Sequence, residues 1–141
     1  MSAVYNGLVF RTHLEAHWAA FFDLAGWQWW INPAPVGDWK PDFKVSFKCT
    51  HSECNGQHTL LVGILPAANL SAFAGHPCMQ HNYGVRVEPN DWRADGGAAF
   101  GSSPAVTRWE ISHGAGGGIE TMTDRVADAQ ILWSKAAPLV K

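Results

Sequence analysis

The sequence predicts a single α/β domain over residues 1–141, with a central mixed sheet of about four strands flanked by N- and C-terminal helices. Three observations lead to this prediction. The chain has 141 residues, a length that suits one hydrophobic core. Hydrophobic residues make up 47% and charged residues 16%, which is typical of an ordered globular protein. Helical spacing of apolar residues occurs near both ends, and strand-like patterns lie between them.

The clearest element is a helix that begins at Thr12. Residues 12–15, Thr-His-Leu-Glu, fit a capping box, in which the threonine and glutamate side chains bond to backbone amides of the first turn. Apolar residues then recur at helical spacing as far as Gly26, which ends the helix: Leu14, Trp18, Phe21, Phe22 and Ala25. The helix is therefore predicted to present one apolar face to the core.

Three strands are expected after this helix. Residues 27–31 are aromatic and β-branched and stop before Asn32-Pro33. Residues 41–48 alternate between apolar and polar side chains, so one face of that strand should be wet. Residues 60–65 are apolar on both sides, as in a central strand. The polar segment between the last two strands predicts a hairpin with a long tip.

Fewer elements are expected in the second half of the chain. We predict a short helix at 69–74, a weak strand at 83–88 and a strand at 106–111, with residues 90–104 and the glycine run 114–118 as loops. Thr123-Asp124 should cap a final helix that ends before Pro138. Its shared apolar side would contain Val126, Ala129, Gln130, Trp133 and Ala137.

Composition limits the classes of function. Ten Lys+Arg against twelve Asp+Glu give a formal charge of −2, so nucleic-acid binding would need a local basic patch. The apolar runs are far shorter than the ~20 residues of a membrane span, and the N-terminus does not fit a signal peptide. We therefore expect a soluble, cytoplasmic protein with no membrane partner. An odd number of cysteines, three, favours reduced thiols over a disulfide framework.

Four soft or borderline metal ligands lie close together in the chain: Cys49, His51, Cys54 and His58. Such a set can close tetrahedrally around zinc. The spacing is not one of the common zinc pairs, so reduced thiols and polar loop histidines are the first interpretation and zinc is the alternative. The fold is not expected to depend on this zinc.

A second group of residues suits a hard cation. Asp42 and Lys44 share the polar side of their predicted strand, Lys48 lies further along it, and Glu15 begins the preceding helix. Divalent-metal hydrolysis of a phosphodiester uses carboxylates to hold Mg²⁺ or Mn²⁺, and an ammonium to stabilise the nucleophile or the developing charge. The plainer interpretation is that Glu15 only caps its helix and that the lysines only solvate a surface.

Residues 10–22 read Phe-Arg-Thr-His-Leu-Glu-Ala-His-Trp-Ala-Ala-Phe-Phe, and residues 41–43 read Pro-Asp-Phe. These segments resemble the opening of small phage and prophage proteins of the PD-(D/E)xK nuclease superfamily, which typically read FRSRLEARWAVFFD, then LPDF, then a strand carrying E-V-K. Residues 99–101, 108–110 and 132–136 are similar more loosely. The resemblance implies a restriction-endonuclease-like fold, the host cytoplasm as location, and a magnesium centre that includes Glu15 and Asp42.

The third motif departs from that family. The strand that should read Glu-Val-Lys-Pro reads Gly-Ile-Leu-Pro at 63–66, so a metal-binding acid is a glycine and the lysine is a leucine. One interpretation is an active, Mg-dependent endonuclease in which Lys44 or Lys48 replaces the missing lysine. The interpretation we favour is a nuclease-like protein with an incomplete metal centre, which binds nucleic acid or a protein instead of catalysing cleavage.

Eight tryptophans bear on the choice of partner. Trp18, Trp109 and Trp133 are expected in the core, whereas bases could stack on Trp29, Trp30, Trp39 and Trp92. Trp39, beside Lys40, is predicted to contact nucleic acid together with Lys40 and Arg11. DNA is the expected partner, with no small-molecule cofactor. The alternative is a host protein, which the acidic net charge and the many aromatic residues would suit.

Overall fold

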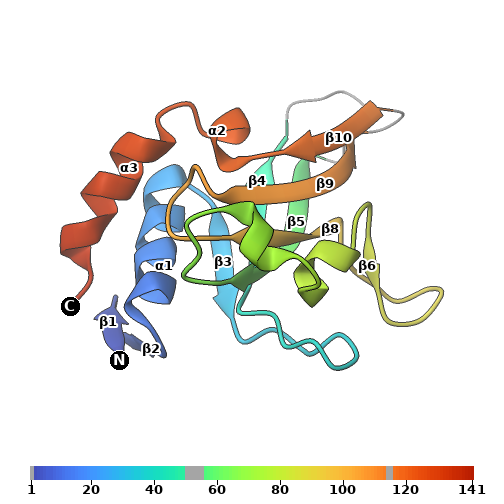
Figure 1. The fold of residues 1–141 in the computed structure, drawn as a ribbon, viewed down its shortest axis with the longest axis horizontal. Coiled ribbons are helices and arrows are strands. Elements are labelled where there is room, and N and C mark those ends of the chain that lie inside the picture. The colour runs from blue at the N-terminus through green and yellow to red at the C-terminus, as the bar shows by residue number, and fades with distance from the viewer. Residues whose placement is uncertain (1, 50–55, 114–115) are drawn as a thin grey trace.

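The computed structural model describes residues 2–49, 56–113 and 116–141. A mixed sheet of six strands, in the order β10-β9-β8-β5-β4-β3, forms the middle of a single α/β domain, so the predicted number of about four strands is wrong. Helices α1 (His13–Ala25) and α3 (Ala129–Ala136) lie side by side against one face of the sheet (Figure 1). Two short 3₁₀ helices, η1 (Leu70–Phe73) and η2 (Pro77–Gln80), pack on the other face.

The sheet has one parallel pair. Strands β3 (Gln28–Ile31), β4 (Phe43–Lys48) and β5 (Gln57–Ile64) form an antiparallel meander. β5 then pairs in parallel with β8 (Gly96–Phe100), which continues antiparallel to β9 (Thr107–His113) and β10 (Gly116–Glu120). A parallel pair needs a crossover, and here η1, η2 and a small hairpin of β6 (Val85–Arg86) and β7 (Trp92–Ala94) supply it.

Helix α1 begins and ends where the sequence predicts. The Thr12 hydroxyl accepts a hydrogen bond from the Glu15 amide at 3.1 Å. At the other end Gly26 adopts the left-handed conformation, with φ of 77°, and its amide donates to the carbonyls of Phe22 and Asp23. These two caps fix the helix so that Glu15, in its first turn, points toward the start of β4.

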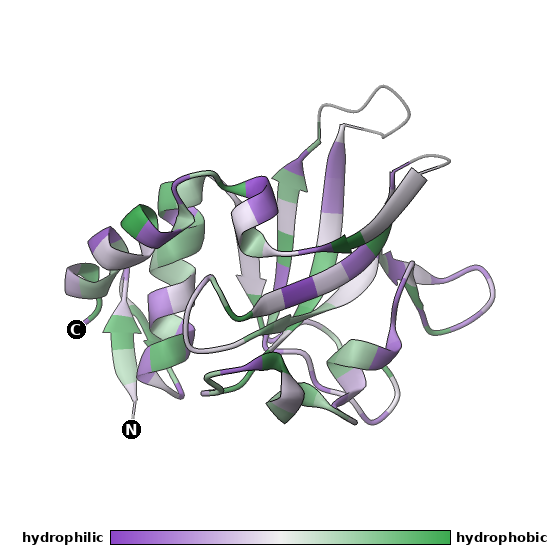
Figure 2. Ribbon diagram, turned by 45° about the horizontal axis from the view of Figure 1, so that its top comes forward, coloured by the Kyte–Doolittle hydropathy of each residue, from purple (hydrophilic) through white to green (hydrophobic). Residues whose placement is uncertain are grey.

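The main core lies between α1, α3 and the sheet. Strand alternation turns Phe43, Val45 and Phe47 of β4 toward α1, and the bands of hydrophobic and hydrophilic residues along the strands are visible in Figure 2. Trp18, Trp109 and Trp133 are all buried there, as predicted. A second, smaller cluster on the opposite face contains Leu61, Phe73, Cys78, Val85 and Ala99. The polar side of β4 therefore lies on the same face of the sheet as this second cluster and is not exposed to solvent along its whole length.

Several predicted elements differ from the structure. The region 90–104 was expected to be loop but contains β7 and β8, and the glycine run contributes to β10. β8 escaped prediction because its Gly96, Gly97 and two alanines resemble a loop. A Cβ at Gly97 would lie 2.6 Å from the carbonyl oxygen of Cys78, so small residues are needed for η2 to pack there.

The two ends of the chain also differ from prediction. The final helix is divided into α2 (Met122–Arg125), capped by Thr121 rather than Thr123, and α3. A hairpin of β1 (Ala3–Tyr5) and β2 (Leu8–Phe10) precedes α1, and its turn at Asn6-Gly7 has positive φ at both residues. Among helices of the described residues, none has the length and apolar character to cross a bilayer.

Candidate functional site

The two carboxylates that the resemblance assigns to a metal centre lie beside each other. Glu15 is in the first turn of α1, and Asp42 immediately precedes β4. Arg11 bridges them, since its Nη2 lies 3.0 Å from Glu15 Oε1 and 2.5 Å from Asp42 Oδ1. The other Asp42 oxygen accepts a hydrogen bond from the Ile64 amide at 2.8 Å. A pocket of about 70 Å³ is lined by these three charged side chains and by Val9, Phe10, Ile31, Asn32 and Phe43.

The electrostatics of this pocket depend on Arg11. Glu15 is only 8% exposed, and its burial raises the pKa of its carboxyl group. The neighbouring Arg11 guanidinium lowers the pKa of Glu15, and the Asp42 carboxylate raises it again. The guanidinium therefore offsets the repulsion between two carboxylates that share one small space.

The position of the third motif is filled by other residues. Because Phe43 pairs with Val62, Gly63 comes opposite Asp42 at the next step of the ladder. A Cβ at Gly63 would lie 2.9 Å from His76 Cε1 and 3.2 Å from Cys78 Cβ. The next residue of the motif, Leu65, packs against the second hydrophobic cluster. Apolar packing thus occupies the side of β5 where the resemblance implies an acid and a lysine.

The two lysines proposed as replacements are placed very differently. Lys44 is two residues beyond Asp42 on the same face of β4, and its Nζ lies 4.9 Å from the ring centroid of Trp30. Lys48 lies six residues from Asp42, which at about 3.3 Å per residue is about 20 Å along the strand. Lys48 is therefore too far away to assist a metal ion held by Asp42, and that part of the sequence-based expectation is wrong.

The predicted nucleic-acid contacts are placed in part as expected. The Arg11 side chain is 66% exposed despite its two ion pairs, and Lys40 is exposed. Both line a pocket of about 240 Å³ together with Asn32 and three prolines, Pro33, Pro35 and Pro41. Trp39, in contrast, is 6% exposed and stacks on His81, so a base cannot stack on it as predicted. Trp30 and Trp92 are the exposed tryptophans of that group.

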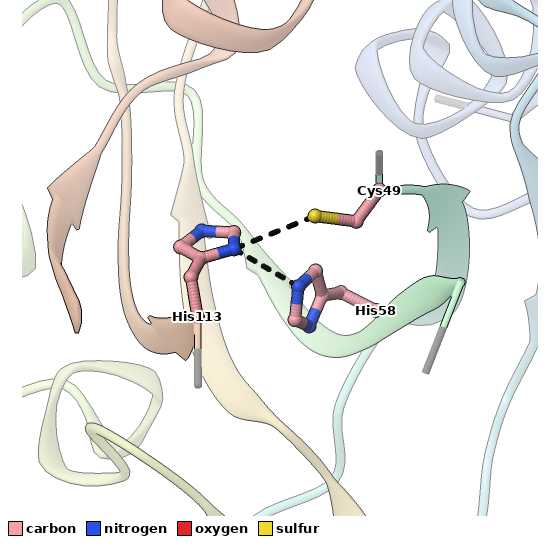
Figure 3. Close-up of side chains that lie close together, drawn as sticks. All are labelled: Cys49, His58 and His113. Carbon is pink, nitrogen blue, oxygen red and sulfur yellow. Dashed lines mark hydrogen bonds between the residues drawn. The ribbon is translucent and has the colours of Figure 1, made fainter. Parts of the chain in front are cut away.

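A separate group of soft ligands lies at the far end of the sheet. Figure 3 shows Cys49, His58 and His113 converging from the end of β4, the start of β5 and the end of β9. His113 Nδ1 lies 3.1 Å from His58 Nε2 and 3.5 Å from Cys49 Sγ. The ligand atoms of all three residues lie within 4.8 Å of one another. Two further predicted ligands, His51 and Cys54, lie outside the described residues.

The sequence-based prediction missed His113, which is 55 residues from His58. A signal was present in the strand alternation, because His113 continues the inward series Trp109, Ile111 at the end of β9. His58 similarly precedes the inward residues of β5.

Charged residues surround this group of soft ligands. His113 Nε2 lies 2.5 Å from Glu120 Oε2, and His58 Nδ1 lies 3.4 Å from Asp95 Oδ2. Arg125 donates from Nε to Glu120 at 2.6 Å, and its Nη2 lies 2.7 Å from His113 Nε2. Each imidazole therefore has a carboxylate at its outer nitrogen.

Comparison of the chain with protein-family models, with curated proteins and with solved structures found no match.

Proposed function

We propose that the chain is a PD-(D/E)xK nuclease-like domain with an incomplete metal centre, which binds DNA without cleaving it. The observation that carries the proposal is the Arg11 guanidinium between Glu15 and Asp42. It supports loss of catalysis because the position between the two carboxylates is taken by a cation of the protein itself.

A magnesium ion at this place would have to displace Arg11. The ion needs near-octahedral oxygen coordination, usually by one or two carboxylates, water and substrate phosphate. Glu15 and Asp42 would remain as ligands, but β5 carries Gly63 and Leu65 where a further acid and a lysine are required. Metal binding would thus cost two charge-assisted hydrogen bonds and would bring no cationic assistant from β5.

The surface around the pocket suits a polyanion with stackable bases. Arg11 and Lys40 line one hollow, and Lys44 lies beside the exposed Trp30 on the edge strand β3. Arg11 is already paired with Glu15 and Asp42, so the charge available to phosphates comes from Lys40 and Lys44. Trp30 offers an indole face to a base in a single-stranded or distorted segment.

The proposal is tested by binding and cleavage on the same preparation. Fluorescence anisotropy with labelled duplex and single-stranded DNA should give an affinity that falls steeply with salt. Lys40→Gln and Lys44→Gln should each weaken binding and lower the magnitude of the salt slope by about one. Lys135→Gln, on α3, is the matched control and should leave both quantities unchanged.

Plasmid nicking in Mg²⁺ and Mn²⁺ decides between binding and turnover. We expect intact plasmid at every metal concentration. Metal-dependent nicking that disappears in both Asp42→Asn and Lys44→Gln would instead establish the active endonuclease with a relocated lysine. Absence of DNA binding at low salt would overturn the proposal and turn attention to a protein partner.

A further inference from the structure

We infer that Cys49, His58 and His113 form a binding site for a soft divalent cation, with zinc as the fitting ion. The inference is independent of the carboxylate pocket, because the two groups lie at opposite ends of β4. Its ligands are one thiolate sulfur and two imidazole nitrogens, a donor set that zinc prefers.

The topology of the sheet creates the space for this site. β8 begins at Gly96, which pairs with Leu60 of β5. Because Ala98 of β8 pairs with Trp109 of the antiparallel strand β9, Gly96 lies opposite Ile111. His58 comes two residues before Leu60, and His113 comes two residues after Ile111. Both residues are thus at the end of the sheet at which β8 begins. The two imidazoles therefore meet beyond the first residue of β8, with 3.1 Å between His58 Nε2 and His113 Nδ1.

Strand alternation turns all three ligands to the same face. Cys49 continues the inward series of β4 after Phe47, His58 comes two residues before Leu60, and His113 comes two residues after Ile111. Cys49 and His58 are each only 6% exposed. The ligands thus arise from the backbone geometry of three strands rather than from one loop.

Two of the three ligand–ligand distances are close to those of a zinc tetrahedron. With Zn–N of about 2.0–2.1 Å and Zn–S of about 2.3 Å, tetrahedral geometry separates two nitrogens by about 3.3 Å and a nitrogen and a sulfur by about 3.6 Å. The corresponding distances are 3.1 Å between His58 Nε2 and His113 Nδ1, and 3.5 Å between His113 Nδ1 and Cys49 Sγ. The third pair, His58 Nε2 and Cys49 Sγ, lies within 4.8 Å and would have to come to about 3.6 Å for all three ligands to hold the ion.

The surrounding carboxylates favour the metal-binding form of both histidines. Glu120 beside His113 Nε2 and Asp95 beside His58 Nδ1 are placed to accept a hydrogen bond from the outer nitrogen of each imidazole once its inner nitrogen binds a metal ion. A cation between the two inner nitrogens would replace the hydrogen-bond contact between His58 Nε2 and His113 Nδ1. Zinc and Arg125 would together bring three positive charges, which the Cys49 thiolate, Glu120 and Asp95 balance.

The first test measures metal in the full-length chain. After chelation and removal of the chelator, titration with zinc alone should end at one ion per chain and raise the thermal unfolding temperature. Cobalt(II) in place of zinc should give the intense visible bands of tetrahedral coordination together with a thiolate charge-transfer band. Cys49→Ser should remove the charge-transfer band, and His58→Gln and His113→Gln should abolish stoichiometric binding.

Matched controls separate ligand loss from misfolding. Cys78→Ala, in the second hydrophobic cluster, and His13→Gln, at the exposed start of α1, remove the same side-chain types elsewhere and should keep the full stoichiometry. Glu120→Gln keeps all three ligands and should weaken zinc binding about 10-fold to 100-fold. If a ligand variant does not fold, the inference is judged from the cobalt spectrum of the wild type and from the zinc affinity of Glu120→Gln.

Two results would overturn the inference. One is a wild-type chain that takes up no zinc, or that binds cobalt without a thiolate band. The other is zinc binding that persists with equal affinity in all three ligand variants.

Discussion

The imidazole of His17 stacks on the indole of Trp133, with ring centroids 3.5 Å apart and planes inclined by 18°. His17 Nε2 also lies 2.8 Å from the Trp133 carbonyl oxygen, which requires the proton on Nε2. Through these two contacts a residue of α1 is joined both to a side chain and to the backbone of α3. The contact lies at the centre of the helical layer that covers the main core.

This stacking predicts a dependence of stability on pH. Burial lowers the pKa of His17 below its ordinary value, and the nearby His13 lowers it further, although the bond to Trp133 acts in the opposite direction. The unfolded chain therefore takes up a proton at a higher pH than the folded chain, and stability is lost as the pH falls through and below about 6.5. Urea unfolding at pH 8, 6.5 and 5 measures the loss. His17→Phe keeps an aromatic ring but cannot take up a proton, so its free energy of unfolding should fall less between pH 8 and pH 5. An identical pH dependence in both proteins would contradict the prediction.

Removing Arg11 should expose the repulsion between Glu15 and Asp42. In Arg11→Met we expect a loss of roughly 1–3 kcal/mol in the free energy of unfolding at pH 7, because a buried carboxylate loses its partner. Burial already raises the pKa of Glu15, and without the guanidinium the pKa rises further. A group whose pKa is raised on folding destabilises the fold once the pH exceeds its ordinary value. The deficit should therefore be smaller at pH 5 than at pH 7.

The same variant tests whether Arg11 blocks the metal position. Calorimetric titration with Mn²⁺ should detect tighter binding to Arg11→Met than to the wild type, since two carboxylates become available. Arg11→Met combined with Asp42→Asn should lose that gain. Equal Mn²⁺ affinity in wild type and Arg11→Met would show that the guanidinium does not compete with a metal ion.

Restoring the third motif at Gly63 should damage the fold. A Cβ at this position lies within 2.9 Å of His76 and 3.2 Å of Cys78, so Gly63→Ala should cost about 1–3 kcal/mol and Gly63→Glu more. Thermal and urea unfolding measure both losses. Gly116→Ala, whose Cβ would lie 3.8 Å from the His113 carbonyl oxygen, is the control and should change stability by less than about 0.5 kcal/mol.

The cap of α1 should be worth a measurable amount of stability. Thr12→Ala removes the acceptor for the Glu15 amide and should cost about 1 kcal/mol, whereas Thr12→Ser keeps a hydroxyl and should cost much less. Urea unfolding of the three proteins measures the difference. Equal losses in the alanine and serine variants would mean that the threonine methyl group, not the hydrogen bond, is responsible.

Local signals made the first half of the chain predictable. A hydroxyl cap at Thr12 and a glycine stop at Gly26 bound α1 on both sides, and the clean alternation from Phe43 to Lys48 marks β4. β8 could not be found in this way. Gly97 leaves room for the close approach of η2, and Gly96 for Ile111 of β9, requirements that exist only in the folded structure.

The candidate sites were predictable to the extent that their residues are neighbours in the chain. Cys49 and His58 stand nine residues apart and were recognised as a group, whereas His113 comes to them only through the pairing of β9 with β8. Glu15 and Asp42 were grouped from their chemistry and position and again through the resemblance. The sequence did not reveal that Arg11 would bridge them, because the ion pair depends on how β2 enters α1.

β10 forms one edge of the sheet, and its first three residues, Gly116, Gly117 and Gly118, carry no side chains. If β10 were shifted by two residues along β9, each of its residues would stay on the same face of the sheet. Because glycines have no side chains to pack, packing alone favours one register over the other only weakly. Glu120 adds a specific contact, because in the observed alignment its carboxylate reaches both His113 and Arg125. The outermost strand is thus tied to its neighbour by charged side chains at the end opposite its glycines.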